Sequence, residues 1–266
     1  MRPAVALAVL AAVLWLGGCA SSAEQKAELE RRQRLADTHT QLGVSYMQRG
    51  QLEIAKQNLD KALEVDPDSV QANNMMALLQ WRLKNFVEAE RHFRKSLYDD
   101  AGKGNSDGWN NFGVFLCERG QFDTAEQAFQ RALADPLYRT PAEANVNAGI
   151  CQMRKPAPAT AEKYFRAALE HNPKQARALL ELARLSFNAG RSLSARAFMQ
   201  RYFAVAEDTP DALLLAIRIE GTLGNRDAEA SYALRLRGKF PDSTEASQLP
   251  VGKGTGAKKG EPRAKR

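Results

Sequence analysis

A small residue followed one helical turn later by a bulky one recurs at nearly constant spacing along most of this chain. The small residue is alanine each time, at intervals of 34, 36, 36 and 34 residues: Ala55, Ala89, Ala125, Ala161 and Ala195. The bulky residue stands four positions later: Leu59, Phe93, Phe129, Phe165 and Met199. Residues four apart share one face of a helix, and small residues let two helices cross closely. The pattern therefore predicts a solenoid of antiparallel helix pairs.

A period near 34 residues is typical of tetratricopeptide repeats, each of which is a helix, a turn and a second helix. Glycine is expected just after the first helix of a pair, because a left-handed backbone is cheapest there without a side chain. Gly50, Gly120, Gly190 and Gly224 fit this position. Pro67, Pro173 and Pro241 follow second helices, which proline cannot continue.

We therefore predict an all-α fold, a right-handed superhelical solenoid of about six repeats over residues 36–249. The predicted repeats begin at Ala36, Val70, Ser106, Ala142, Ala176 and Pro210.

The N-terminus resembles a bacterial lipoprotein signal. Arg2 precedes an apolar run from Ala4 to Leu16, which is too short to span a bilayer comfortably. The sequence Leu16-Gly17-Gly18-Cys19 resembles a lipobox. We expect cleavage of residues 1–18, lipidation of Cys19 and, because Ala20 and Ser21 follow, anchoring to the periplasmic face of the outer membrane.

Residues 19–35 are predicted to carry the lipidated cysteine and a charged linking segment. This segment contains no Gly or Pro after Cys19, so it either extends the first helix or acts as a solvated tether; we favour the tether.

Cys117 and Cys151 are the two other cysteines, and an oxidising compartment would allow them to pair. They lie 34 residues apart, on corresponding first helices of neighbouring repeats. Helix axes are about 8–10 Å apart, whereas a disulfide needs Cα atoms within about 7 Å. The expectation is two separate thiols.

The net charge of +7 is concentrated at the C-terminus, where residues 251–266 hold six basic residues and one acidic residue. The repeats are nearly neutral, so no nucleic-acid partner is expected. Residues 250–266 have too little apolar content to fold, and we predict a disordered basic tail. Contact of this tail with an anionic envelope surface is the alternative to plain solvation.

Residues that could carry catalysis are not grouped in any recognisable motif. His39, His92 and His171 are scattered without metal-ligand spacing. We expect no enzymatic activity, no metal and no cofactor.

A protein-binding groove is the functional feature that the repeats predict. First helices of tetratricopeptide repeats line the concave face, and here four successive ones carry apolar residues with asparagines beside them. The predicted groove consists of Val44, Met47, Asn74, Leu78, Trp81, Asn110, Val114, Ile150 and Met153. Exposed contiguous apolar surface usually marks an interaction site, with Trp81 as the best anchor. The alternative is that these residues only pack between repeats.

Several runs resemble the type IV pilus biogenesis and stability lipoproteins of the PilW and PilF family. They are Gln41 to Gly50, Lys61 to Pro67, Trp109 to Cys117, Lys155-Pro156, Ala161 to Leu169 and Ala212 to Arg218. Asn110-Asn111 and the run Leu213 to Arg218 lie outside the minimal repeat pattern.

The resemblance implies a pilotin, a lipoprotein that binds the pilus secretin and promotes its outer-membrane localisation and multimerisation. The alternative is a lipoprotein scaffold for outer-membrane barrel assembly or for peptidoglycan hydrolases.

Overall fold

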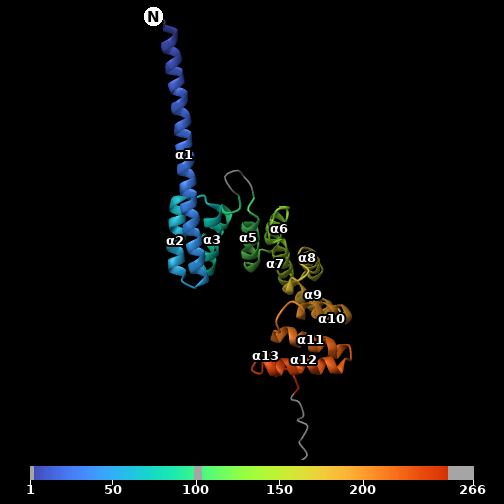
Figure 1. Ribbon diagram of the computed structural model, residues 1–266. Coiled ribbons are helices and arrows are strands. Elements are labelled where there is room, and N and C mark those ends of the chain that lie inside the picture. Colours follow the sequence, from blue (N-terminus) through green and yellow to red (C-terminus); the bar gives the residue numbers. More distant parts are fainter. Residues whose placement is uncertain (1–2, 99–103, 251–266) are drawn as a thin grey trace, which may run out of the picture. The chain divides into compact units, whose positions relative to one another are not determined.

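The chain is helical throughout the part that the structure describes. The computed structural model describes residues 3–98 and 104–250, with side chains from Ser22 onward. Within these ranges it forms thirteen helices and no strand (Figure 1). The prediction of an all-α solenoid is confirmed.

The helices divide between two compact units, Met1–Tyr164 and Phe165–Arg266. The first unit holds α1 (Pro3–Gln48), α2 (Leu52–Val65), α3 (Val70–Arg82), α4 (Phe86–Lys95), α5 (Ser106–Glu118), α6 (Phe122–Leu133) and α7 (Pro141–Arg154). The boundary falls within α8 (Pro158–His171). The second unit continues with α9 (Ala176–Asn188), α10 (Ser192–Phe203), α11 (Pro210–Thr222), α12 (Arg226–Lys239) and the short α13 (Thr244–Ser247).

First helices begin where the repeat pattern places them. Helices α3, α5, α9 and α11 begin at the predicted Val70, Ser106, Ala176 and Pro210, and α7 begins one residue before Ala142. Within each unit the first helix of a pair packs on the second, as α1 does on α2, α5 on α6 and α11 on α12.

The recurring alanines lie in the core. All five, from Ala55 to Ala195, are fully buried, and the bulky residues that follow them are at most 2% exposed. Opposite them, Gly43 and Gly113 leave room for Leu59 and Phe129 respectively. The small and bulky partners therefore interlock across each helix pair.

The predicted turn glycines have left-handed backbones. Gly50, Gly120, Gly190 and Gly224 have φ between 71° and 75°. In the second repeat the same position is Lys84, which has φ 63° although it is not glycine. Its amide donates to the Trp81 carbonyl, and the Asn85 amide donates to the Gln80 carbonyl, so the helix end is closed as a glycine would close it.

The last helix pair is covered at its outer side by the residues that follow it. Leu249, 9% exposed, packs with Leu213, Ile217 and Leu236 from α11 and α12. Unit two thus ends on a contact that shields the apolar side of its final pair.

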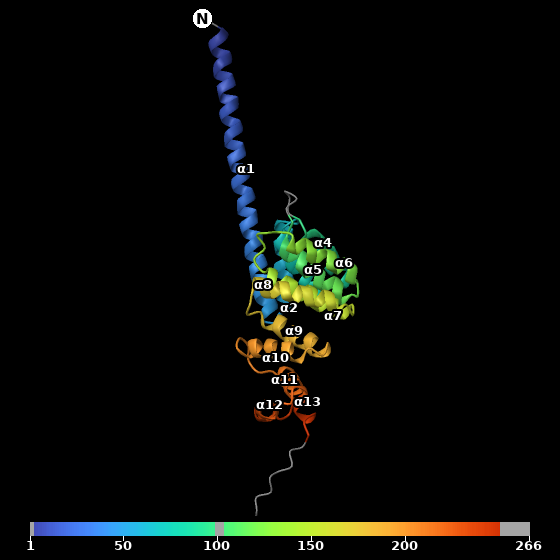
Figure 2. The same ribbon diagram turned by 90° about the vertical axis from the view of Figure 1, so that its right-hand side faces the viewer.

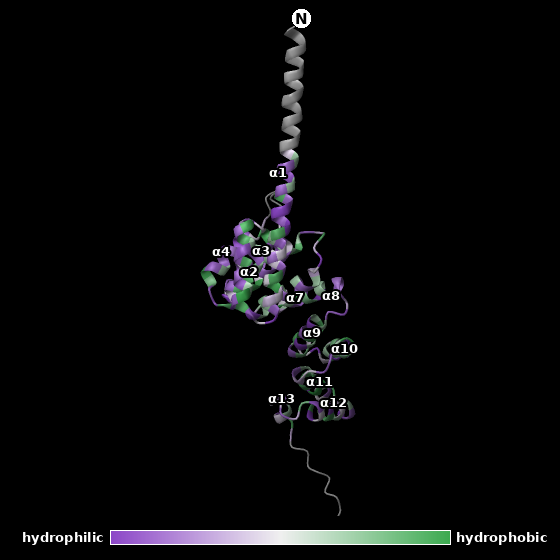
Figure 3. Ribbon diagram, turned by 60° about the vertical axis from the view of Figure 1, so that its left-hand side comes forward, coloured by the Kyte–Doolittle hydropathy of each residue, from purple (hydrophilic) through white to green (hydrophobic). Residues whose placement is uncertain are grey.

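Helix α1 extends far beyond the helices that it packs against (Figures 1 and 2). Residues 22–35 are helical and exposed, so the helical alternative for this segment is the one observed and the favoured tether conformation is wrong. Ion pairs between Glu28 and Arg31 and between Glu30 and Arg34 run along it. Figure 3 shows this segment as mostly hydrophilic.

The proposed lipidation residue Cys19 lies in the part of α1 whose side chains are outside the description, and the basic tail from residue 251 is outside it entirely. Among the described residues, no helix has the length and apolar character needed to cross a membrane.

Candidate protein-binding site

The predicted groove residues come from four first helices that lie side by side in unit one. Helix α1 contacts α3, α3 contacts α5, and α5 contacts α7. The seven apolar members are all partly buried: Val44, Met47, Leu78, Trp81, Val114, Ile150 and Met153. We call these seven residues the apolar stripe. Partial burial means that each side chain contributes to packing and still presents surface to solvent.

Trp81 belongs to both the core and the surface. Its ring lies edge-on to the rings of Phe93 and Phe115, with centroids 6.3 Å and 5.7 Å away. Leu78 and Val114 pack against the same cluster, whereas Met47 packs against the cluster of the first helix pair. Trp81, Leu78, Val114 and Met47 therefore do pack against the core, as the alternative interpretation of the sequence held. This packing keeps the tryptophan in a fixed orientation.

The two predicted asparagines are less accessible than their neighbours. Asn74 and Asn110 are only 4% and 9% exposed. The Asn74 amide oxygen accepts a bond of 3.3 Å from Asn111, and that of Asn110 accepts one of 3.1 Å from Asn147. These amide pairs join α3 to α5 and α5 to α7.

Asn111 and Asn147, which were not predicted as site residues, are the partly exposed members of these pairs. Each uses its amide nitrogen in the pair, so its carbonyl oxygen remains available to accept a further bond. The sequence signal for them was the asparagine directly after Asn110 and its counterpart 36 residues later, Asn147.

The expectation of two separate cysteine thiols is wrong, because Cys117 and Cys151 form a disulfide. Their Cα atoms are 5.8 Å apart, and the bond joins α5 to α7. The error came from using the distance between helix axes. Each Cα atom lies about 2.3 Å from its own helix axis. Two Cα atoms that face each other are therefore closer together than the axes are, and axes about 10 Å apart still allow a disulfide. The bridge lies beside the apolar stripe, because Cys117 follows Val114 by one turn and Cys151 adjoins Ile150.

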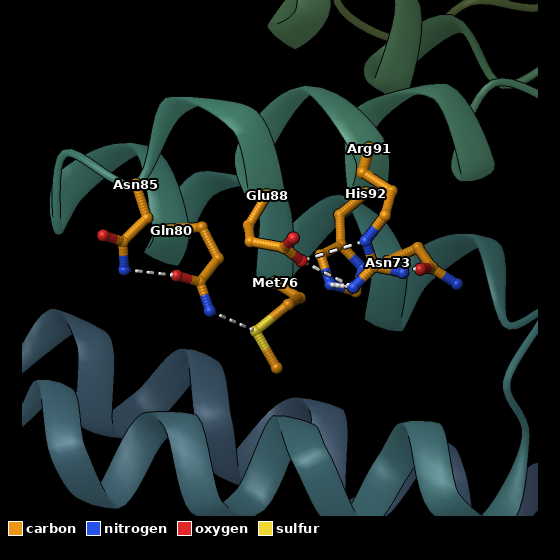
Figure 4. Close-up of polar contacts among 7 residues, drawn as sticks. All are labelled: Asn73, Met76, Gln80, Asn85, Glu88, Arg91 and His92. Atoms are coloured by element: carbon orange, nitrogen blue, oxygen red, sulfur yellow. Dashed lines mark hydrogen bonds and ion pairs between the residues drawn. The ribbon is translucent and has the colours of Figure 1, made fainter.

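A different face of α3 carries a polar cluster (Figure 4). Asn73, Met76 and Gln80 line a cleft of about 660 Å³ together with residues of α2 and α4. His92 Nδ1 lies 2.8 Å from the Asn73 amide oxygen, and Arg91 donates to His92 Nε2 over 2.9 Å. Since arginine can only donate, Nε2 accepts and Nδ1 carries the proton.

Burial, and next the positive charge of Arg91, lower the pKa of His92 from 6.5 to about 4. His92 is thus a neutral structural link between α3 and α4, as expected of an ordinary helix histidine. In the described part of the chain no three His, Cys, Asp or Glu side chains gather in a way that could hold a metal.

Comparison with known proteins identifies the repeats. One tetratricopeptide-repeat family model matches residues 40–106 and 116–169, and a second matches residues 157–217. The chain is 33% identical over 256 residues to the type IV pilus assembly protein PilF of Pseudomonas aeruginosa, covering 95% of this chain and 100% of that protein.

Among the solved structures that resemble this one are those of two pilus proteins. The structure of P. aeruginosa PilF has a TM-score of 0.73 at 33% identity, covering 81% of this chain and 96% of its own. The structure of PilW, described as a widely conserved type IV pilus biogenesis factor, has a TM-score of 0.70 at 33% identity, covering 80% of this chain and 96% of its own.

Proposed function

Because this chain belongs to the PilF and PilW family of tetratricopeptide-repeat proteins, we propose that it acts in type IV pilus biogenesis as a pilotin. In this role it binds the pilus secretin and promotes its localisation to the outer membrane and its multimerisation. The collinear match over the full length of PilF supports the pilus process, and the apolar stripe supports a protein partner.

The apolar stripe is the observation that carries the binding proposal. It runs across four adjacent first helices, and side chains that present apolar surface in one contiguous row usually mark an interaction site. Trp81 is partly exposed and is held by two core phenylalanines, so little side-chain entropy is lost when a partner packs against it. The carbonyl oxygens of Asn111 and Asn147 lie on the same helices and can accept bonds from the partner's main chain.

The anchoring part of the proposal rests on the sequence. Residues 1–18 are a signal peptide, Cys19 carries lipid, and residues 19–35 link it to the repeats of residues 36–249. Several acyl chains on one cysteine hold a protein at a membrane far more firmly than one chain would. The solenoid is thereby kept at the periplasmic face of the outer membrane, where a secretin subunit bound to it inserts and multimerises. The reaction is one of binding alone, with no catalytic step.

The test compares secretin in membranes from cells with the gene, without it, and with Cys19→Ser. Unheated samples should contain ring-sized multimers only when the lipidated protein is present. In the Cys19→Ser strain, secretin should stay partly monomeric or accumulate at the inner membrane. Normal outer-membrane multimers in both altered strains would refute the pilotin role, and altered permeability or septation with normal pili would favour the scaffold alternative.

A further inference from the structure

The polar cleft of unit one lies between the second helices α2 and α4, and one face of α3 forms its floor. Its volume of about 660 Å³ falls within the range of ligand pockets. Asn73, Met76 and Gln80 supply the floor, whereas the apolar stripe uses Leu78 and Trp81 of the same helix. The cleft is therefore a different surface from the proposed secretin-binding one.

Two linked carboxamides at one end of the cleft have hydrogen-bonding capacity to spare (Figure 4). The Asn85 amide nitrogen donates to the Gln80 amide oxygen over 2.9 Å. Gln80 is only 7% exposed, yet the one acceptor for its own amide nitrogen in the described chain is the Met76 sulfur, 3.5 Å away. Thioether sulfur is a weak acceptor. The Asn85 oxygen accepts no bond from any described residue, so the pair offers one N–H donor and one carbonyl acceptor.

Four of the charged side chains that line the cleft neutralise each other along their own helices. Lys56 pairs with Asp60 on α2 over 2.7 Å, and Arg91 pairs with Glu88 on α4 over 2.7 Å. These pairs leave the middle of both walls without a net charge.

The far end of the cleft has opposite charges on its two walls. Glu64 is exposed in the last turn of α2 and has no ion pair within the described part of the chain. Lys95 is the last residue of α4, and its contact with Asp68 is long, 3.8 Å, between exposed side chains, so it is weak. Both α2 and α4 run antiparallel to α3, which places Glu64 and Lys95 at the same end. A ligand there meets a negative wall on one side and a positive wall on the other.

The two ends of the cleft are separated by the length of a short extended peptide. From Asn85 to Lys95, helix α4 rises about 15 Å, at about 1.5 Å per residue. An extended chain covers that distance in about five residues, and its successive side chains point to opposite sides. Its main-chain N–H and C=O groups are free to bond outward, whereas those of an α-helix are used internally.

We propose that this cleft binds an extended peptide segment of about five residues with adjacent lysine and glutamate side chains at one end. The lysine contacts Glu64 on the α2 wall while the glutamate contacts Lys95 on the α4 wall. At the other end, one peptide group accepts a bond from Gln80 and donates one to Asn85. The protein thus has a second partner-binding surface, for a charged segment instead of an apolar one.

The test uses fluorescently labelled peptides Ala-Ser-Ala-Lys-Glu, Ala-Ser-Ala-Lys-Lys and Ala-Ser-Ala-Glu-Glu, all with blocked ends. Fluorescence anisotropy follows their titration with the purified full-length protein. The Lys-Glu peptide should bind saturably. Each of the other two should bind about fivefold more weakly, because one of its side chains faces a like charge.

Charge reversal on either wall should change which peptide is preferred. Glu64→Lys makes both walls positive and should favour the Glu-Glu peptide, whereas Lys95→Glu should favour the Lys-Lys peptide. Asn85→Ala should weaken all three peptides by a similar factor, because it removes a main-chain contact that they share. Lys61→Glu is the matched control: Lys61 is exposed on α2 but does not line the cleft, so the preference should stay with Lys-Glu.

Circular dichroism should show all variants folded, since each altered side chain is exposed. No saturable binding, equal affinity for the three peptides, or an unchanged preference in folded Glu64→Lys and Lys95→Glu overturns the proposal. A preference of the unaltered protein for Glu-Glu also overturns it, because general attraction to the basic chain would then explain binding. None of these outcomes bears on secretin binding by the apolar stripe.

Discussion

A methyl group on Gly113 would lie only 2.8 Å from Cε1 of the Phe129 ring, which is closer than a Cβ atom comes to a non-bonded neighbour in proteins. Gly113→Ala should therefore force the ring or helix α5 to move, lowering the free energy of unfolding by about 1–3 kcal/mol. Denaturant unfolding measures this loss. Gly238→Ala is the control, because the added Cβ meets nothing within 4 Å on α12, and it should raise stability by about 0.5–1 kcal/mol. Equal effects of the two changes would contradict the close-packing argument.

Lys84 occupies a left-handed position at which four other repeats have glycine. Lys84→Gly should raise the free energy of unfolding by up to about 1 kcal/mol, because the strain of a side chain at positive φ is removed. The gain is partly offset by the greater freedom of glycine in the unfolded chain. The reverse change, Gly120→Lys, should destabilise by a similar amount. A Tm that falls in Lys84→Gly would show that the lysine side chain stabilises this turn.

The disulfide closes a loop whose ends are 34 residues apart in unit one. Cys117→Ser with Cys151→Ser should lower the free energy of unfolding by about 3–4 kcal/mol, because the unfolded chain gains loop entropy. The measurement is denaturant unfolding of the double variant beside the oxidised parent. A reducing agent should lower the stability of the parent to that of the variant and leave the variant unchanged. A parent insensitive to reduction would contradict the predicted contribution.

His92 makes stability depend on pH in a defined window. Its folded pKa of about 4 lies below the unfolded value of 6.5, so between these values the unfolded chain binds a proton that the folded chain does not. Stability contributed by the neutral imidazole is complete above pH 6.5 and falls as the pH is lowered towards 4. The loss should amount to a few kcal/mol. Titration of the unfolding midpoint in His92→Gln should lack this component, whereas exposed His171→Gln should keep it.

At the α7 end of the apolar stripe, substitutions should weaken partner binding without lowering the stability of the fold. Ile150 and Met153 are partly exposed and do not belong to the core cluster that holds Trp81. Ile150→Glu with Met153→Glu should therefore reduce co-purification of secretin at least tenfold with little change in Tm. Trp81→Ala should lower both, because it also removes contacts to Phe93 and Phe115.

Val87→Glu, on α4 and 82% exposed, is the control and should leave secretin binding unchanged. Unchanged co-purification with the folded Ile150→Glu, Met153→Glu variant would move the binding surface off the apolar stripe. The comparison of secretin multimers in membranes would then be the remaining test of the pilotin role.

The helix pairs could be predicted because the packing rule is local and repeats. Ala125 and Phe129 carry enough information by themselves, since one small and one bulky residue on a face determine how two neighbouring helices cross. The disulfide could not be predicted in this way, because its formation depends on a few ångströms of separation between α5 and α7. Lys84 was missed for a related reason: its left-handed backbone is imposed by the helices on both sides, not by its own preference.

For the candidate site, sequence position indicated which helices contribute but not how deeply each side chain is buried. Asn74 and Asn111 illustrate this. Both lie on first helices and are bonded to each other, yet Asn74 is buried and Asn111 is partly exposed. The role of Trp81 as an anchor stays a prediction. Its edge-on contacts with two phenylalanines depend on the following helices and required the structure.

Because α1 is an unbroken helix, its N-terminal extension has a fixed length. From Ser22 to Ala36 the helix rises about 1.5 Å per residue, which places the first repeat roughly 20 Å from the point where the described side chains begin. A stiff rod of this kind transmits both height and rotation, whereas a loose tether would transmit neither. Removing seven residues would lower the solenoid by about 10 Å with nearly the same facing, but removing five would turn it by more than a quarter of a revolution. The length of this rod therefore sets where, and in which direction, the repeats meet whatever approaches them.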